Sequence, residues 1–323
     1  MNILITGGAG YIGSHTCLAL MDKGHSVTIL DNLITSSEKL IPKRANFIKT
    51  DISDIPTVSK IIKNKKFDAT LHFAGLISVN ESIKFPKKYY ENNYEKTKIF
   101  LKCCLDNNLN NFIFSSSACV YGIGQKEKYV ETDKLSPTNP YAKSKFDTEK
   151  LIIEESKKGK LKFMILRYFN VAGADNKKRS GLISDFNDNL IKNLCQVATG
   201  KKEKIIINGN DYQTKDGTAV RDFIHVSDLA NIHVLVTERL KKNGESNLYN
   251  CGYGEGYSVK EVVDEMDKLL KNKLKREIGP QRKNDIISSV ADTRKFTKDF
   301  NWKPEFNNLN YILKTALEWE KSI

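Results

Sequence analysis

Short apolar runs alternate with longer segments of helical periodicity through the first half of the chain. Six of these runs have the length of buried strands, at residues 2–6, 27–30, 47–50, 69–73, 111–115 and 163–169. The helical patterns between them, such as the one at residues 11–21, are long enough to be crossover connections. This alternation predicts an α/β fold, a doubly wound parallel sheet of the Rossmann type with helices on both faces.

The pattern changes after residue 170. Polar, glycine-containing loops at residues 173–181 and 209–217 surround helical segments at 227–241 and 258–270. We expect residues 1–170 to form a nucleotide-binding domain. Residues 171–323 would mainly form a smaller substrate-binding lobe, with some segments returning to the first domain. The chain has no repeat, low-complexity tract or long linker, so the lobe should pack closely on the sheet.

Composition and charge narrow the class of protein. The hydrophobic content of 40% and charged content of 28% are ordinary for a soluble enzyme, and no apolar run predicts a signal peptide or a membrane span. The six cysteines form no CxxC pair, which favours reduced thiols and a cytoplasmic location. The net charge of +13 comes from scattered lysines without interleaved aromatic residues, so we expect solvated helix faces and no nucleic-acid partner. The five histidines show no metal-ligand spacing, and no metal is expected.

A glycine-rich turn follows the first predicted strand. Gly7 and Gly10 fall between that strand and the helix that begins at Tyr11, and Gly13 falls in the first turn of that helix. Such a turn needs positive φ angles, and a diphosphate can approach backbone N–H groups at a helix N-terminus only where no Cβ intervenes. The second predicted strand leads into Asp31, where a carboxylate can accept hydrogen bonds from both ribose hydroxyls and would repel a 2′-phosphate. The pattern therefore predicts bound NAD rather than NADP.

A second motif supplies candidate chemistry. Tyr141 and Lys145 lie one helical turn apart after Pro140, so their side chains share a face. An ammonium and a positive nicotinamide ring would both favour the tyrosine phenolate, which can then act as a base near neutral pH. The fifth predicted strand ends in serines at the same sheet edge, and we choose Ser117 as the hydroxyl that binds the reacting oxygen.

Several stretches, in order along nearly the whole chain, resemble those of one family. They are TGGAGYIGSHT from Thr6, LDNL from Leu30, HFAGL from His72, NNFIFSSSACVYG from Asn110, NPYAKSK from Asn139, LRYFNVAGA from Leu166, GNDYQTKDGTAVRDFIHVSDLA from Gly209 and SVADTRK from Ser289. These stretches are similar to the UDP-glucose 4-epimerase family of the extended short-chain dehydrogenase/reductase superfamily. The resemblance implies a tightly held NAD that takes hydride from C4 of a UDP-sugar and returns it to the other face of a 4-keto intermediate.

The resemblance also implies a role for individual residues. Ser117, Tyr141 and Lys145 would be the catalytic group. The NAD site would comprise Gly7, Gly10, Tyr11, Ile12, Gly13, Asp31, Asn32, Leu33, Thr35, Ser36, Asp51, Ile52, Phe73, Ala74, Gly75, Asn93, Ser115, Tyr141, Lys145 and Phe169. The UDP-sugar would be held by Ser117, Asn170, Asn189, Leu190, Arg221, Arg282, Asp285 and Ser289. Two guanidinium groups, Arg221 and Arg282, suit a diphosphate.

Two positions depart from the family pattern, and a third bears on specificity. Ile77 stands where some epimerases have a lysine near the cofactor, and Asn208 stands where an aromatic side chain can stack on uracil. Ser289 matches a position that borders the C2 substituent of the sugar. A small residue there implies that N-acetylated UDP-hexoses are also substrates. The resemblance further implies a homodimer built on helices at residues 89–106 and 141–155.

Three other functions remain open at this point. A nucleotide-sugar 4,6-dehydratase shares the fold, but relatives of that kind carry an Asp-Glu pair where this chain has Ala118 and Cys119. A net dehydrogenase or reductase would share the first hydride step. A catalytically silent protein that senses NAD or binds nucleic acid would not need Ser117, Tyr141 and Lys145 together.

Overall fold

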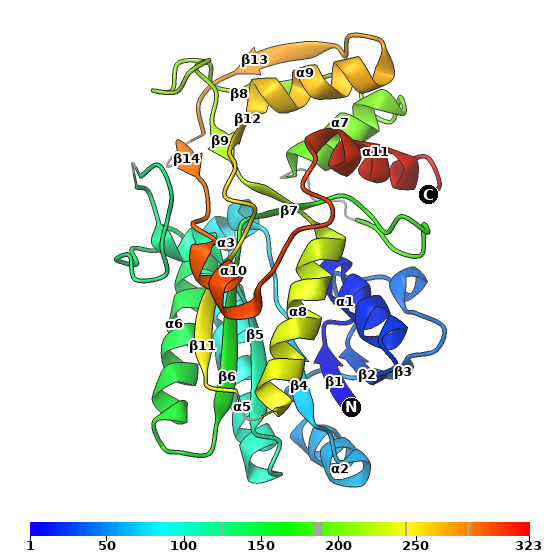
Figure 1. Ribbon diagram of the computed structural model, residues 1–323, viewed down its shortest axis with the longest axis vertical. Coiled ribbons are helices and arrows are strands. Elements are labelled where there is room, and N and C mark those ends of the chain that lie inside the picture. The colour runs from blue at the N-terminus through cyan, green and yellow to red at the C-terminus, as the bar shows by residue number, and fades with distance from the viewer. Residues whose placement is uncertain (125, 184–188, 243, 283–284) are drawn as a thin grey trace.

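The computed structural model describes residues 1–124, 126–183, 189–242, 244–282 and 285–323. Its main feature is a parallel sheet in the order β11-β6-β5-β4-β1-β2-β3, in which seven strands of the described chain take part (Figure 1). The strands are β1 (Asn2–Thr6), β2 (Ser26–Asp31), β3 (Asn46–Lys49), β4 (Ala69–His72), β5 (Asn111–Ser117), β6 (Lys162–Tyr168) and β11 (Asn247–Cys251). The predicted doubly wound parallel sheet is thereby confirmed.

One strand of this sheet escaped the sequence analysis, which predicts six. β11 comes from the second half of the chain and pairs in parallel with β6, from Asn247 opposite Met164 to Cys251 opposite Tyr168. Its sequence NLYNC carries polar residues inside the run, so it lacks the continuous apolar pattern of a buried parallel strand. The other six strands begin and end within about two residues of their predicted limits, the ordinary uncertainty of such boundaries.

Helices cover both faces of the sheet and enclose two hydrophobic clusters. On one face lie α1 (Tyr11–Asp22), α8 (Val226–Lys241) and α10 (Arg294–Phe300). On the other face lie α2 (Ile55–Lys65), α5 (Lys96–Asp106) and α6 (Pro140–Ser156). Because both faces are covered, central strands such as β4 are buried along their whole length.

Shorter elements connect these parts. They are the 3₁₀ turns η1 (Glu38–Leu40) and η3 (Ala118–Tyr121), the helices α3 (Val79–Lys84) and α4 (Pro86–Tyr90), and the π-helical turn η2 (Glu91–Glu95). α4, η2 and α5 follow one another directly and pack against α6. The helix expected at residues 89–106 is therefore present, with a π-helical turn inside it.

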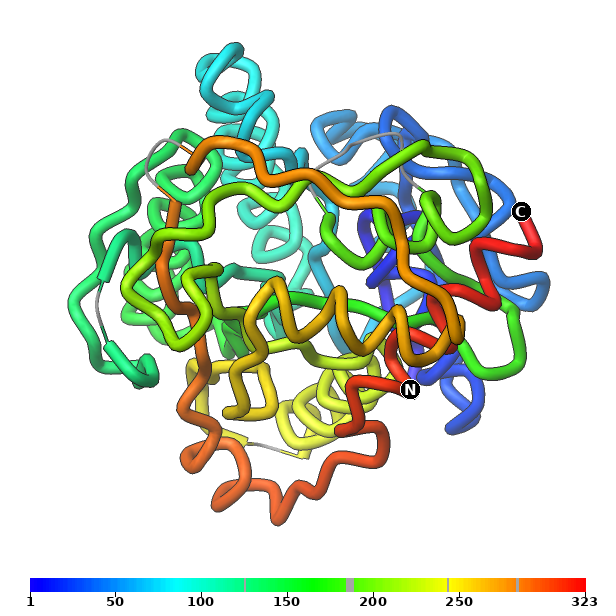
Figure 2. The backbone as a smooth tube through the Cα atoms, turned by 90° about the horizontal axis from the view of Figure 1, so that it is seen from above, coloured from blue at the N-terminus to red at the C-terminus, as the bar shows by residue number. Residues whose placement is uncertain are grey.

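A smaller layer lies over the carboxyl ends of the strands, at the top of Figure 1. Its helices are α7 (Leu190–Ala198), α9 (Val259–Leu270) and α11 (Leu309–Glu320), which share a separate hydrophobic cluster. Its short strands are β7 (Asn170–Ala172) with β10 (Phe223–His225), β8 (Ile205–Asn208) with β13 (Arg276–Gly279), and β9 (Val220–Arg221) between β12 (Tyr257–Ser258) and β14 (Ser288–Ser289). Viewed from above, β8 and β13 run side by side across this layer (Figure 2).

Hydrogen bonds join this layer to the first helix of the sheet domain. The Tyr11 hydroxyl donates to the carbonyl oxygen of Gly173 at 2.6 Å, and the Ser14 and Ser180 hydroxyls lie 2.6 Å apart. The two layers thus meet directly beside the nucleotide turn. Among the described residues, no helix is long and apolar enough to span a membrane.

Candidate active site

A cleft of about 390 Å³ lies at the carboxyl edge of the parallel sheet, below the smaller layer. Ligands of doubly wound sheets bind at this edge. The predicted residues that line the cleft are Gly7, Gly10, Tyr11, Ile12, Gly13, Asp31, Asn32, Thr35, Ser36, Asp51, Ile52, Phe73, Ala74, Gly75, Ser115, Ser117, Tyr141, Lys145, Phe169, Asn170 and Asn189. The structure therefore brings most of the predicted cofactor residues and all three predicted catalytic residues into one cleft.

The glycine turn has no room for a side chain at Gly7 or Gly13, and of its three motif glycines only Gly7 has the expected positive φ. Gly7 has φ of 71°, and a Cβ added to Gly13 would lie 2.3 Å from the Gly7 carbonyl oxygen. The first turn of α1 has no side-chain cap and no acidic residue. Its backbone N–H groups and positive helix end are thus suited to an anion such as a diphosphate.

Asp31 ends β2 and organises the loops on either side of the cleft. Its carboxylate accepts hydrogen bonds from Ala9 N at 3.0 Å, Leu33 N at 2.9 Å and Ser36 Oγ at 2.7 Å. Leu33 has a positive φ of 61° and lies outside the cleft lining, so its contact with NAD stays a prediction. The position of the carboxylate in the cleft suits the ribose contact expected for NAD.

Asp51 and Asn93 support the cleft by different contacts. Burial alone would raise the pKa of the Asp51 carboxyl, but hydrogen bonds from Lys96, Ser53 and Asn32 hold it well below its usual range. The Asn93 side chain accepts from Leu76 N at 2.8 Å and donates to Leu76 O at 2.9 Å. Asn93 is buried behind the lining residues and fixes the backbone of the loop that follows β4.

The three predicted catalytic residues converge from β5 and α6. Asn139 caps α6 by accepting from Ala142 N at 2.9 Å, and Pro140 occupies the first helical position, so the helix begins just before Tyr141. Lys145 Nζ donates to the Ser115 carbonyl oxygen at 2.8 Å and lies 6.0 Å from the centroid of the Tyr141 ring. Ser117 is the last residue of β5, beside this pair.

Burial dominates the electrostatics of the pair. Burial raises the pKa of the Tyr141 phenol and the nearby Cys119 thiol raises it further, whereas a hydrogen bond with Ser117 lowers it. Burial lowers the pKa of Lys145 to about 8, and the Glu149 carboxylate opposes this change. Lys145 therefore stays mostly an ammonium at pH 7. Burial by itself keeps the Tyr141 phenol protonated near neutral pH, so its phenolate would need the positive nicotinamide ring of bound NAD in addition to the Lys145 ammonium.

Of the predicted substrate residues of the smaller layer, Asn170 and Asn189 line the cleft, whereas Arg221, Arg282 and Asp285 form a polar group outside its lining. Arg221 Nη2 donates to Asp285 Oδ1 at 2.8 Å, and the Tyr212 hydroxyl donates to Asp285 Oδ2 at 3.1 Å. The charge of Arg282 lowers the pKa of Arg221, after the larger effect of burial, so the two cations lie close together. This pairing of two guanidinium groups is suited to a diphosphate.

Three further positions complete this group. With its amide oxygen turned toward Arg282, Asn208 accepts from Arg282 Nη2 at 3.1 Å and from Nε at 3.2 Å. Ser289 is buried on β14, in register with Arg221 on β9. Leu190 is the first residue of α7, whose cap is Asn189, and it packs in the hydrophobic cluster of this layer.

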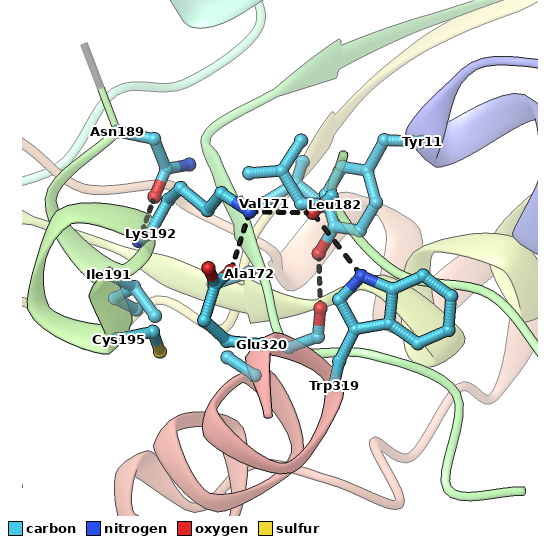
Figure 3. Close-up of a pocket in the computed structure, with 12 residues that line it drawn as sticks. Tyr11, Val171, Ala172, Leu182, Asn189, Ile191, Lys192, Cys195, Trp319 and Glu320 are labelled. Atoms are coloured by element: carbon cyan, nitrogen blue, oxygen red, sulfur yellow. Dashed lines mark hydrogen bonds and ion pairs between the residues drawn. The ribbon is translucent and has the colours of Figure 1, made fainter. Parts of the chain in front are cut away.

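Sequence reasoning did not find part of the cleft wall. Leu182 and Ile183 line the cleft, but they come from a polar loop with no periodic pattern. A small cavity behind this wall shows how it is held (Figure 3). The Leu182 carbonyl accepts from Trp319 Nε1 and from Lys192 Nζ, each at 3.2 Å, and Lys192 also pairs with Glu320 at 2.5 Å.

Comparison with known proteins agrees with this geometry. Residues 3–252 match the model of the NAD dependent epimerase/dehydratase family. The chain belongs to this family. A UDP-glucose 4-epimerase of Halalkalibacterium halodurans is 40% identical over 99% of this chain and 96% of that protein. The resemblance to epimerases and the expected dependence on NAD are thereby confirmed at the level of the family.

Solved structures in the family share the whole architecture. A UDP-glucose-4-epimerase from Stenotrophomonas maltophila, solved with NAD and formylated UDP-arabinopyranose, has a TM-score of 0.96 and 35% identity, covering 100% of this chain and 98% of that one. The UDP-Glc/GlcNAc 4-epimerase from Campylobacter jejuni has a TM-score of 0.86 and 41% identity, covering 100% and 99%. The arrangement of sheet and smaller layer is thus shared over the full length of the chain.

Proposed function

We propose that the protein interconverts UDP-hexoses that differ at C4, UDP-glucose and UDP-galactose among them, with NAD held throughout the cycle. The observation that carries this proposal is the convergence of Ser117, Tyr141 and Lys145 on the cleft that begins at the glycine turn. Family membership and the epimerase relatives support the same conclusion.

The residues present fit NAD. The glycine turn excludes a Cβ at Gly7 and Gly13, the uncapped end of α1 suits the diphosphate, and Asp31 suits the adenosine ribose. When bound, NAD supplies a hydride acceptor that is also the hydride donor of the return step. The Lys145 ammonium lies near Gly75 at the same edge, where it can hydrogen-bond the second ribose.

The side chains of this chain supply the acid and base. The Tyr141 phenolate removes the proton of the sugar 4-hydroxyl and keeps it on Oη until it returns to the 4-oxygen. Lys145 stabilises the phenolate, and Ser117 donates a hydrogen bond to the 4-oxygen. Arg221 and Arg282 anchor the diphosphate, so the 4-keto sugar can turn about this anchor and present its other face.

The contacts at η3 argue against a dehydratase. Elimination needs an acid and a base beside the sugar, where this chain has Ala118 and Cys119. Burial raises the pKa of the Cys119 thiol, so it is a poor acid and is not ionised as a base near neutral pH. Epimerisation, by contrast, needs only the groups already in the cleft.

The first test is cofactor stoichiometry. We expect the purified protein, once denatured, to release about one NAD per chain, and the native protein to convert UDP-galactose without added NAD. NADH should not accumulate during turnover. Absence of bound nicotinamide dinucleotide, together with activity that depends on added NAD, would contradict the proposal.

We infer that N-acetylated UDP-hexoses are also substrates. Ser289 has a short side chain and is in register with Arg221, and the relative from Campylobacter jejuni is described as acting on both sugar classes. A coupled assay that compares UDP-galactose with UDP-N-acetylgalactosamine tests this extension. No turnover of the second sugar would overturn it and leave the first activity in place.

We also infer a homodimer built on the helical face of α4, η2, α5 and α6. Ile99 on α5 is about half exposed, as are Ile83 on α3 and Phe85 just before α4, whereas Phe100 and Ile152 are buried in the core. The exposed group is typical of an association surface. Sedimentation as a monomer at micromolar concentration would contradict the dimer.

We infer a cytoplasmic location as well. All six cysteines have free thiols in the structure, and five are buried. Unpaired thiols are typical of a reducing compartment. Cell fractionation with an antibody against the protein tests this location.

A further inference from the structure

Glu149 follows Tyr141 and Lys145 at the same four-residue spacing on α6, and the proposed reaction assigns it no role. It lies one turn after Lys145 on α6, as Lys145 lies one turn after Tyr141, and it is only 1% exposed. A fully buried carboxylate is rare unless it is paired and hydrogen-bonded. Its contacts therefore show what it stabilises.

The Glu149 carboxylate ties α6 to the two strands that end at the cleft. Oε1 accepts from Ser116 Oγ at 2.5 Å and from Arg167 Nε at 3.0 Å, and Oε2 accepts from Arg167 Nη2 at 2.7 Å. Ser116 lies on β5 and Arg167 lies on β6. These contacts fix the position of α6 along β5, and with it the positions of Tyr141 and Lys145 relative to the end of that strand.

Ser116 stands between two residues with roles at the cleft. The Ser115 carbonyl receives the hydrogen bond of Lys145, and Ser117 is the proposed hydroxyl donor. Because side chains alternate along a strand, Ser116 points toward Glu149 while its neighbours point the other way. Holding Ser116 thus sets the position of both Ser115 and Ser117.

Glu149 also supplies a charge at a buried ammonium. Lys145 is 5% exposed, and among the described residues Glu149 is the carboxylate whose charge opposes the effect of burial on it. The other titratable groups around the Lys145–Glu149 pair are Tyr141 on α6, His72 on β4, Arg167 and Tyr168 on β6, and Cys119 and Tyr121 on η3. His72 is neutral in this setting, because burial lowers its pKa to about 3.

We propose that Glu149 is a positioning residue of the catalytic centre, whose buried carboxylate holds the Ser115–Ser117 segment in place and keeps Lys145 in its charged form. Arg167 limits the effect of Glu149 on the charge of Lys145, because the guanidinium neutralises part of the carboxylate charge. The same guanidinium completes the hydrogen bonds of the carboxylate. The inference rests on the proposed epimerase cycle for its kinetic consequence, but the charge state of Lys145 can be measured without any sugar.

The decisive variant is Glu149→Gln, which keeps the shape of the side chain and removes its charge. We expect Lys145 to lose its proton about one pH unit lower than in the wild type, an ordinary size for the loss of one nearby charge. The alkaline limb of the kcat/KM profile should move down by the same amount. NMR of the NAD-bound protein labelled with ¹³Cε-lysine, with Lys145→Met to assign the resonance, reads the protonation directly.

Matched variants separate charge from position. Glu155→Gln removes a carboxylate from the same helix, where Glu155 pairs with Lys158 at the surface, and it should leave both readouts unchanged. Ser116→Ala breaks the hydrogen bond and keeps the charge, so kcat should fall while the alkaline limb stays in place. If Glu149→Gln does not fold because Arg167 is left unpaired, the double variant Glu149→Gln/Arg167→Met removes two opposite charges together. Its shift in the Lys145 titration should then be smaller than that of Glu149→Gln, but kcat should still fall because Ser116 loses its ionic anchor.

The outcomes distinguish this inference from the proposed function. A folded Glu149→Gln variant in which the Lys145 resonance titrates as in the wild type, or a folded double variant with wild-type kcat, would overturn the role of Glu149. A wild-type protein inactive on UDP-hexoses would refute the epimerase proposal, and the NMR titration would still decide the charge state of Lys145. Rescue of the alkaline limb by Glu149→Asp would support the charge as the cause.

Discussion

Two alanine substitutions in the nucleotide turn should have different consequences: Gly13→Ala should lower stability, and Gly10→Ala should lower NAD binding. The reason is that the structure places the two added methyl groups differently. At Gly13 a Cβ would lie 2.3 Å from Gly7 O and 2.9 Å from Gly8 Cα, both backbone atoms. Gly7 cannot retreat, because its own Cβ position is 2.5 Å from Ala74 N. At Gly10 the nearest atom is Gly7 O at 3.3 Å, and φ of −85° suits any L-residue.

Gly13→Ala must therefore displace the turn by roughly 1 Å, and overpacking of this kind costs about 1–3 kcal/mol of stability. Gly10→Ala should change the stability of the stripped protein by less than about 1 kcal/mol, because the loss of backbone freedom in the unfolded chain offsets the mild contact. Gly10 lines the cleft at the end of α1, where the diphosphate is expected, so an added methyl group should lower the NAD content. Thermal unfolding of NAD-free protein and nicotinamide release on denaturation measure both effects. A Gly13→Ala protein that melts with the wild type, or equal destabilisation of both variants, would refute this reasoning.

Three further substitutions test the chemistry and the walls of the cleft. Tyr141→Phe should keep the fold and bound NAD but lower kcat by about two to four orders of magnitude, the usual contribution of a positioned acid or base; near-normal turnover would remove Tyr141 from the mechanism. Ser289→Tyr should abolish activity on N-acetylated UDP-hexoses and largely spare UDP-glucose, measured as the two kcat/KM values, and an equal loss of both would contradict a role at C2. Trp319→Phe removes the indole N–H that donates to the Leu182 carbonyl. Loss of one hydrogen bond of about 1 kcal/mol should raise the KM for UDP-sugar about fivefold and leave kcat within about twofold. An unchanged KM would show that Lys192 alone holds this wall.

The sequence was informative wherever local pattern and chemistry coincide. Strands such as β1 and β4 are continuous apolar runs because helices cover both faces of the sheet. The motif residues that follow these strands reach one cleft because parallel strands end at one edge. The glycine turn, Asp31 and the pair Tyr141 and Lys145 were found for this reason.

The remaining features depend on contacts between distant segments. β11 has a mixed sequence and joins β6 across about eighty residues of intervening chain, so no local pattern marks it. Leu182 lines the cleft, and its carbonyl is held from behind by Trp319 and Lys192, which are distant in the sequence or follow the loop. The sequence predicts Asn93 among the cofactor residues, whereas the hydrogen bonds that hold its side chain to Leu76 depend on the packing of η2 against the loop after β4. Such placements follow from packing rather than from spacing along the chain.

The most direct test of a closed hydride cycle is the fate of the hydrogen at C4. UDP-glucose deuterated at C4 should be incubated with the purified protein in ordinary water, without added NAD, and followed by proton and deuterium NMR. The account predicts that UDP-galactose appears with its deuterium still at C4, because the hydride leaves and returns inside one closed cleft. Protium at C4 of the product, or deuterium recovered in free NADH, would contradict it.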